Sequence, residues 1–106
     1  MPQDPREIEH LAEMFRLMGD PNRLRILLHV LEAPSAVGEI AEAAGLSHSL
    51  VSHNLGRLRA ARLVRAERRG KRVFYEAADA HVRSVLRDML EHVGEVDLAP
   101  PAGGDA

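Results

Sequence analysis

The residues best suited to chemistry lie near the C-terminus, where two pairs of metal-binding side chains follow one another. Asp79 and His81 form the first pair, and His92 and Glu95 form the second. Carboxylates and imidazoles bind zinc and similar ions at about 2 Å. The two histidines are eleven residues apart, which corresponds to about 16 Å along a helix. One ion therefore cannot bind both histidines of the same helix.

A second copy of the helix would remove this difficulty. Eleven steps of about 100° make nearly whole turns, so both histidines point along one side of the helix. If two copies packed antiparallel, the start of one would lie beside the end of the other. The spacing therefore predicts a metal site shared between two subunits.

Size and composition limit the class of protein. The chain has 106 residues, of which 45% are hydrophobic and 3% aromatic, so we expect one small domain that gains stability by dimerising. The absence of cysteine excludes disulfides, thiolate metal ligands and cysteine nucleophiles. No apolar run approaches the roughly 20 residues of a membrane span, and the N-terminus lacks the features of a signal peptide. We therefore expect a cytoplasmic protein with no membrane partner.

The charges are segregated along the chain. The formal net charge is −2, which alone argues against binding to nucleic acid. Residues 57–72, however, contain many basic residues and a single acid, Glu67. Such a segment is either a solvated surface or the electrostatic footprint of a nucleic-acid-binding protein. Its basic residues are Arg57, Arg59, Arg62, Arg65, Arg68, Arg69, Lys71 and Arg72.

Apolar residues at helical spacing predict five helices that position these groups. They span residues 5–18, 21–33, part of 35–45, 48–61 and 80–95. Four helices follow a residue that favours the N-cap, namely Asp4, Asp20, Ser47 and Asp79. Gly45 is placed to end the third helix in a left-handed turn. The third and fourth helices, joined by this short turn, match a helix-turn-helix.

A β-hairpin is predicted between the fourth and fifth helices. Residues 63–67 and 72–77 favour strands, and Gly70 favours a tight turn between them. A hairpin directly after a helix-turn-helix is a wing. The predicted fold is therefore mainly α-helical with a small β-hairpin, a winged helix-turn-helix over residues 1–98. A disordered tail is predicted over residues 99–106.

The predicted DNA-binding residues lie on the fourth helix and the hairpin. Short hydroxyls and imidazoles near a helix N-terminus suit the major groove, where they meet phosphates and base edges. They point away from a buried side that we expect to contain Leu50, Val51, Leu55 and Leu58. The basic residues further along would contact phosphates or the minor groove. The full set is Ser47, His48, Ser49, Ser52, His53, Arg57, Arg68, Arg69, Lys71 and Arg72.

Three segments together resemble the ArsR/SmtB-type winged-helix repressors. They are residues 17–27 (LMGDPNRLRIL), residues 37–41 (VGEIA) and residues 46–55 (LSHSLVSHNL). The resemblance covers residues 8–95 and runs through the hairpin. It implies a homodimer, formed through the first and last helices, that binds double-stranded operator DNA and leaves it when an inducer binds.

The resemblance also implies where an inducer would bind. One site of the family needs Cys-x-Cys on the third helix, and this chain has no thiol there, so sensing of arsenite, cadmium or lead by thiolates is not expected. The other site is on the last helix, and this chain matches it at every spacing. By this resemblance, Asp79 and His81 of one subunit bind an ion together with His92 and Glu95 of the other.

Two imidazoles and two carboxylates suit Zn²⁺. Ni²⁺ and Co²⁺ stay open as alternatives, and His10 would then be either a surface residue or an additional ligand. The predicted mechanism is negative allostery, in which metal moves the recognition helices out of the roughly 34 Å spacing of successive major grooves. The resemblance implies a coupling contact from His92 towards the backbone at Arg62.

Two other classes of function are alternatives to this one. The first is a regulator of the same family that does not sense metal and is partner-controlled, constitutive or an activator. The second is an enzyme with a hydrolytic metal centre, which would need an open position for water. The sequence contains no nucleophile motif and no glycine-rich phosphate loop, so no catalytic residue and no organic cofactor are predicted.

Overall fold

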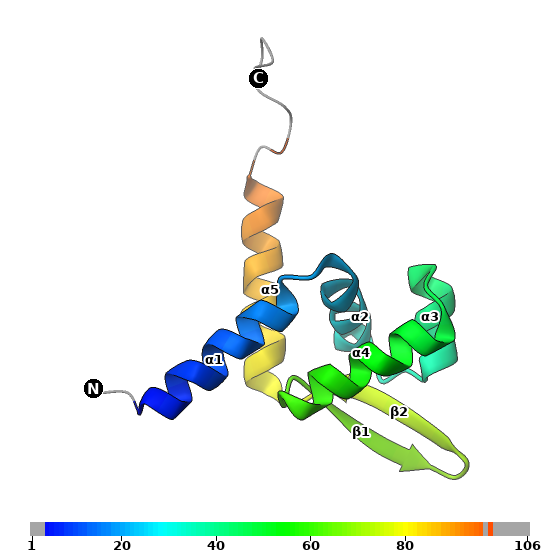
Figure 1. Cartoon of the computed structure of the whole chain (residues 1–106). Helices are drawn as coiled ribbons and strands as arrows, with labels where there is room; N and C mark the ends of the chain where they lie inside the picture. Colours follow the sequence, from blue (N-terminus) through cyan, green and yellow to red (C-terminus); the bar gives the residue numbers. More distant parts are fainter. Residues whose placement is uncertain (1–3, 97, 99–106) are drawn as a thin grey trace.

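The computed structural model describes residues 4–96 and residue 98 of the chain. Five helices and a two-stranded antiparallel sheet follow one another in this part (Figure 1). They are α1 (Pro5–Met18), α2 (Pro21–Glu32), α3 (Val37–Ala44), α4 (His48–Ala60), β1 (Val64–Arg69), β2 (Arg72–Ala77) and α5 (Ala80–Glu95). This order confirms the predicted winged helix-turn-helix. The tail predicted over residues 99–106 lies outside the described residues.

The helices begin where the sequence predicts, because each capping residue accepts a hydrogen bond from the first turn. The accepting side chains are Asp4, Asp20, Ser47 and Asp79, at 2.9–3.1 Å from the backbone nitrogens. Gly45 ends α3 with a φ of +68°, as predicted, and the Leu46 N–H donates to the Ala41 carbonyl across this turn at 3.0 Å. The turn of the helix-turn-helix is therefore fixed by local contacts.

The core lies where α2, α3 and α4 pack together with the start of the hairpin. Its largest fully buried side chains are aliphatic: Ile26, Leu27, Val30, Ile40, Val51, Leu55 and Leu58. The prediction that Leu50 is buried with them is wrong, since Leu50 is 37% exposed and Asn54 is 4% exposed. Leu50 points about 100° away from Val51 around the helix, whereas Asn54 points only about 60° away. Asn54 therefore faces the core and Leu50 lies on its flank.

The hairpin is in register from Val64↔Ala77 at its base to Arg69↔Arg72 at its tip. β1 continues two residues beyond its predicted end, because Gly70 (φ +65°) and Lys71 alone make the turn. A bridge to Ser35 fixes β2 against the loop before α3, with both backbone N–H groups donating, at 3.0 and 2.8 Å from the partner carbonyls of Tyr75 and Ser35. The wing is thus attached to the helix-turn-helix.

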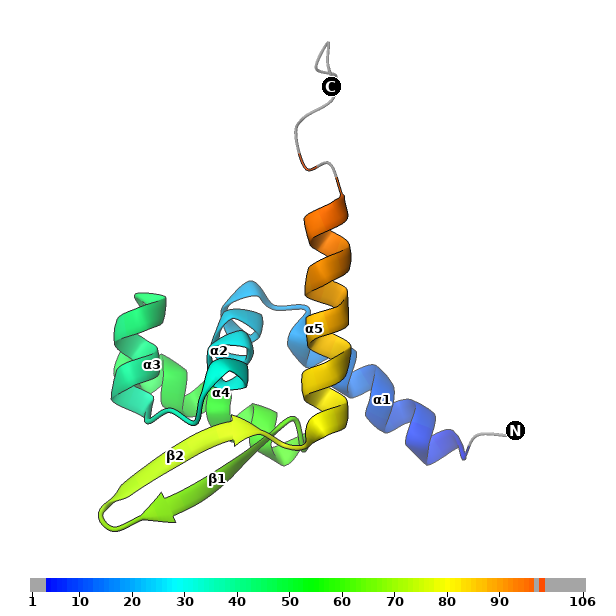
Figure 2. The same ribbon diagram turned by 180° about the vertical axis from the view of Figure 1, so that it is seen from behind.

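Helices α1 and α5 project away from this unit, as the two opposite views show (Figures 1 and 2). Leu17 is the buried residue of α1, and Leu86 is that of α5. Large apolar side chains on both helices face solvent: Ile8, Leu11, Phe15, Val85, Met89, Leu90 and Val93. So many exposed apolar side chains on two helices are typical of an association surface. None of the described helices is long and apolar enough to cross a membrane.

Candidate metal site and nucleic-acid interface

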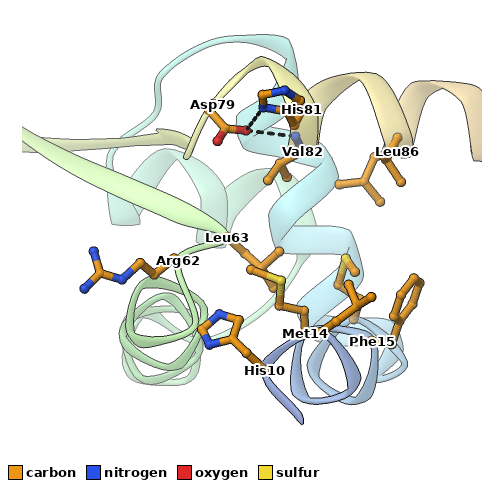
Figure 3. A pocket seen from close by; sticks show the side chains of 12 residues that line it. His10, Met14, Phe15, Arg62, Leu63, Asp79, His81, Val82 and Leu86 are labelled. Atoms are coloured by element: carbon orange, nitrogen blue, oxygen red, sulfur yellow. Dashed lines mark hydrogen bonds and ion pairs between the residues drawn. The ribbon is translucent and has the colours of Figure 1, made fainter. Parts of the chain in front are cut away.

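The first predicted ligand pair lies at the start of α5. Asp79 Oδ1 accepts a hydrogen bond from the Val82 N–H at 3.0 Å, and His81 Nδ1 lies 3.8 Å from the same oxygen (Figure 3). The hydrogen bond from Val82, followed by smaller contributions from His81, lowers the pKa of Asp79 below its usual value of 3.8. The carboxylate is therefore ionised at neutral pH. The His81 side chain is 93% exposed, so it is accessible to an ion.

The second predicted pair lies at the other end of the same helix. His92 and Glu95 are both exposed in the last turns of α5. Within residues 4–96 and residue 98, no three histidines or carboxylates of one chain come close enough to hold an ion. One chain therefore brings together Asp79 and His81 but does not bring them to the second pair. The four-ligand site stays a prediction about two chains.

An apolar stripe separates the two pairs along α5. Val85 and Met89 lie between His81 and His92 in sequence, and their side chains are 51% and 55% exposed. Residues 81, 85, 89 and 92 recur at three- and four-residue intervals, so they share one side of the helix. The side that could pack against another helix thus also carries the two histidines of the predicted metal site.

The predicted recognition surface is exposed on α4. Ser47, His48, Ser49, Ser52 and His53 all face solvent. The Ser47 hydroxyl accepts the Leu50 N–H at 3.1 Å. The opposite side of the helix is in the core, so the exposed side can enter a groove only as a rigid unit with the rest of the domain.

The basic residues of the wing are organised around Phe74. The guanidinium carbons of Arg69 and Arg72 each lie 4.9 Å from the centroid of its ring. Arg69 also pairs with Glu67 at 2.9 Å, and Arg72 Nη2 lies 3.6 Å from a carboxylate oxygen of Glu39 in α3. Contacts within the chain therefore restrain two of the four wing side chains that are predicted to contact DNA, Arg69 and Arg72.

Phe74 was not among the functional residues predicted from the sequence. The signal is the alternation of side chains in the hairpin: Arg72 and Phe74 share a face of β2, and their register partners are Arg69 and Glu67. An aromatic ring next to two arginines on one face could have been predicted once the register was known. The same face also carries the Arg65–Glu76 ion pair, with 3.1 Å between nitrogen and oxygen.

A cavity of about 450 Å³ lies between α1 and α5 (Figure 3). Of the predicted coupling pair, His92 and Arg62, only Arg62 lines it. Asp79, His81 and His10 line it as well. Nε2 of His10 lies 3.1 Å from the carbonyl oxygen of Ala61, beside Arg62. Within one chain, His10 therefore reaches the backbone at the end of α4, a role that the sequence did not indicate, and the coupling contact from His92 stays a prediction.

The chain is similar to known bacterial regulators over nearly all of its described length. Residues 20–66 match the profile of a family described as "Bacterial regulatory protein, arsR family". A transcriptional repressor SmtB homolog from Synechocystis is 37% identical over 91 residues, which cover 86% of this chain and 69% of the homolog.

Two solved structures extend the comparison to three dimensions. The homodimeric winged helix-turn-helix domain of Mb0332 from Mycobacterium bovis, a possible ArsR-family regulator, has a TM-score of 0.76 and 29% identity over 88% of each chain. The cadmium metal-sensor CMTR from Mycobacterium tuberculosis has a TM-score of 0.68 and 35% identity, covering 90% of this chain and 99% of that one.

Proposed function

Because the chain belongs to the ArsR family of bacterial regulatory proteins, we propose that it is a metal-responsive repressor. The dimer binds operator DNA without metal, and an ion held between its two α5 helices releases it. The observation that carries this proposal is the arrangement of α5, where a pair of metal-binding residues stands at each end of an exposed apolar stripe. The family consists of transcription regulators rather than enzymes. Such a repressor acts in the cytoplasm, where bacterial DNA lies.

The dimer follows from the exposed surface of α1 and α5. A small domain that exposes Phe15 by 60% and Met89 by 55% gains free energy by covering them with a second copy. Homodimers of this size usually have a two-fold axis, which makes equivalent surfaces meet. Antiparallel packing of two α5 helices would then create two identical sites. The homodimeric state of the similar Mb0332 domain supports a dimer.

The donor set suits Zn²⁺. Asp79 and His81 from one subunit, with His92 and Glu95 from the other, would provide two nitrogen and two oxygen ligands in a closed tetrahedral shell. The pKa of Asp79 lies below the ordinary 3.8 because the Val82 N–H donates to its carboxylate, so Asp79 is ionised at neutral pH and can bind a cation without first losing a proton. Ni²⁺ and Co²⁺ use similar ligands and are selected by geometry more than by affinity.

On DNA, α4 would lie in the major groove and the wing would contact the backbone. The exposed polar side chains at the start of α4 are placed to meet base edges. Arg57, one turn further, and the wing residues Arg68 and Lys71 would contact phosphates. These contacts would provide affinity for DNA of any sequence. Each phosphate contact would contribute about −0.9 to the slope of log affinity against log salt concentration.

The test measures operator affinity with and without metal. A duplex selected from random sequence by the metal-free protein is titrated by fluorescence anisotropy in buffer alone and with Zn²⁺, Ni²⁺ or Co²⁺. We expect zinc to weaken binding by roughly 5- to 150-fold, the usual range of allosteric coupling. The His81→Ala and His92→Ala variants should bind the duplex normally and not respond to zinc. A protein that none of the three ions releases would instead be a regulator that does not sense metal.

A further inference from the structure

The recognition helix ends in a strained turn. Arg62 has a φ of +65° and is the one non-glycine residue with a positive φ in the described part of the chain. Backbone N–H groups of Arg62 and Leu63 donate to the carbonyls of Arg59 and Leu58, both at 2.9 Å. This is the pattern that commonly ends a helix with glycine, because other residues meet a steric cost there. A non-glycine residue keeps such a conformation only where its surroundings hold it.

One of the groups that holds this turn comes from α1. Nε2 of His10 lies 3.1 Å from the Ala61 carbonyl oxygen, and the two residues are 51 positions apart in sequence. Since a carbonyl can only accept, Nε2 must carry the proton. Ala61 caps the C-terminus of α4, where the last carbonyls have no partner within the helix. His10 therefore donates to a group that the recognition helix cannot satisfy by itself.

We propose that His10 is a positioning residue that fixes the end of the recognition helix to α1. Because α1 belongs to the exposed apolar surface, a shift of α1 in the dimer would be passed to α4 through this contact. The inference rests on the proposed function and adds the contact through which a movement of α1 would reach the recognition helix. His10, Arg62, Asp79 and His81 line the same cavity (Figure 3), so an ion held by Asp79 and His81 would lie beside the strained turn.

A positioning role differs from a purely stabilising one in what a substitution changes. A stabilising contact would alter the unfolding of the domain and leave DNA recognition by the folded protein unchanged. A positioning contact would alter the orientation of α4, and so binding to the selected operator more than binding to unrelated DNA. Unrelated DNA is bound mainly through phosphates, and the basic wing is held by its own contacts to Phe74 and Glu39.

The experiment compares His10→Leu, which removes the donor, with His10→Gln, whose side-chain amide can donate to the same carbonyl. Glu9→Leu places the same side chain on the neighbouring exposed position of α1 and serves as the control. For each full-length protein, amide hydrogen exchange is measured at Arg62 and Leu63 without metal. Affinities for the selected operator and for an unrelated duplex are measured with and without Zn²⁺.

We expect His10→Leu to speed exchange at Arg62 and Leu63 and to weaken metal-free operator binding by roughly 3- to 10-fold, the range that one hydrogen bond supplies. Binding to the unrelated duplex should not change. His10→Gln should recover most of the loss, and Glu9→Leu should behave as the unmodified protein does. Unchanged exchange, or an equal loss on both duplexes, would overturn the proposal.

The zinc measurements separate this inference from the proposed function. If zinc does not release the unmodified protein, yet His10→Leu weakens operator binding selectively, metal sensing fails and the positioning role stands. If zinc releases His10→Leu by the same factor as the unmodified protein and metal-free operator binding is also unchanged, the positioning role fails and metal sensing stands.

Discussion

The helix-turn-helix with its wing is complete in one chain, whereas the pair of helices α1 and α5 is not. In the first region, most large apolar side chains are buried, and the turn between α3 and α4 is fixed by Gly45 and the Ser47 cap. In the second, large apolar side chains face solvent and the metal-binding residues stand in separate pairs. The difference is what we expect if one subunit builds each DNA-recognition surface, while two subunits are needed to build the proposed metal site and to place both recognition surfaces on an operator. Substitutions in the two regions should therefore fail in different ways.

The largest effect is expected from a charge placed on the apolar stripe of α5. Met89→Glu would bury a carboxylate between two subunits, which is costly without a partner charge. We expect the dimer dissociation constant to rise by at least ~100-fold, together with loss of operator binding. Analytical ultracentrifugation and fluorescence anisotropy measure the two effects.

Ser84→Glu is the matched control for this substitution. Ser84 is exposed on α5 and lies about 140° around the helix from Met89, so it changes the net charge equally without touching the stripe. Ser84→Glu should leave the dimer dissociation constant and the affinity for the operator unchanged. If the two variants dissociate alike, the stripe is not the dimer surface and the comparison between the two regions fails.

The next largest effect concerns Asp79, which has one role in each region. Within the chain it caps α5, and in the proposed dimer it binds the ion. Asn is also a good N-cap, so Asp79→Asn should keep the helix and lose the charge. We expect zinc affinity, measured by competition with a chelator, to fall at least ~10-fold while the metal-free melting temperature changes little. A variant that binds zinc normally would remove Asp79 from the ligands.

Acid unfolding gives an independent measurement of the capping role. The hydrogen bond from Val82 lowers the pKa of Asp79 in the folded state. Its contribution to the free energy of unfolding is therefore present at neutral pH and is lost as the pH falls through the folded pKa, below 3.8. Asparagine does not titrate, so Asp79→Asn lacks this pH-dependent contribution to the free energy of unfolding. Its metal-free stability should therefore fall less steeply than that of the unmodified protein as the pH approaches 3.

Which features the sequence could predict depends on how far apart the contacting residues are. The caps at Asp20 and Asp79 were predicted correctly because donor and acceptor are three residues apart. The burial of Leu50 was predicted wrongly because an apolar residue on the flank of a helix resembles one on its buried face. The contact between His10 and Ala61 was missed because it joins residues 51 positions apart, and only the packing of α1 against the end of α4 creates it.

The metal site shows the same limit at the level of two chains. The spacing of its four residues predicts which ends of α5 should meet, and the structure confirms the helix that carries them. Whether they meet depends on how two subunits pack, which is set by the exposed surfaces of α1 and α5 together. The spacing is a local property, but the coordination shell would be a property of the assembly.

The smallest effect is expected in the wing, where the ring of Phe74 contacts two arginines. Phe74→Leu keeps an apolar side chain and every charge, but it removes both cation–π contacts, each about 0.5–1 kcal/mol at an exposed site. Arg69 and Arg72 would then lose part of their restraint before binding. We expect affinity for operator and unrelated DNA to fall alike, by roughly 3- to 5-fold, with an unchanged slope of log affinity against log salt.

Lys71→Ala is the informative contrast, since it removes a charge at the tip of the hairpin and leaves Phe74 with both arginines. If Lys71 contacts a phosphate, its loss should make the salt slope shallower by about 0.9. Fluorescence anisotropy from 50 to 300 mM salt, on the order of the range where such slopes are linear, distinguishes the two variants. A shallower slope for Phe74→Leu would mean that the ring holds an arginine on a phosphate. In that case the wing, unlike the rest of the recognition unit, would depend on one side chain for its contacts.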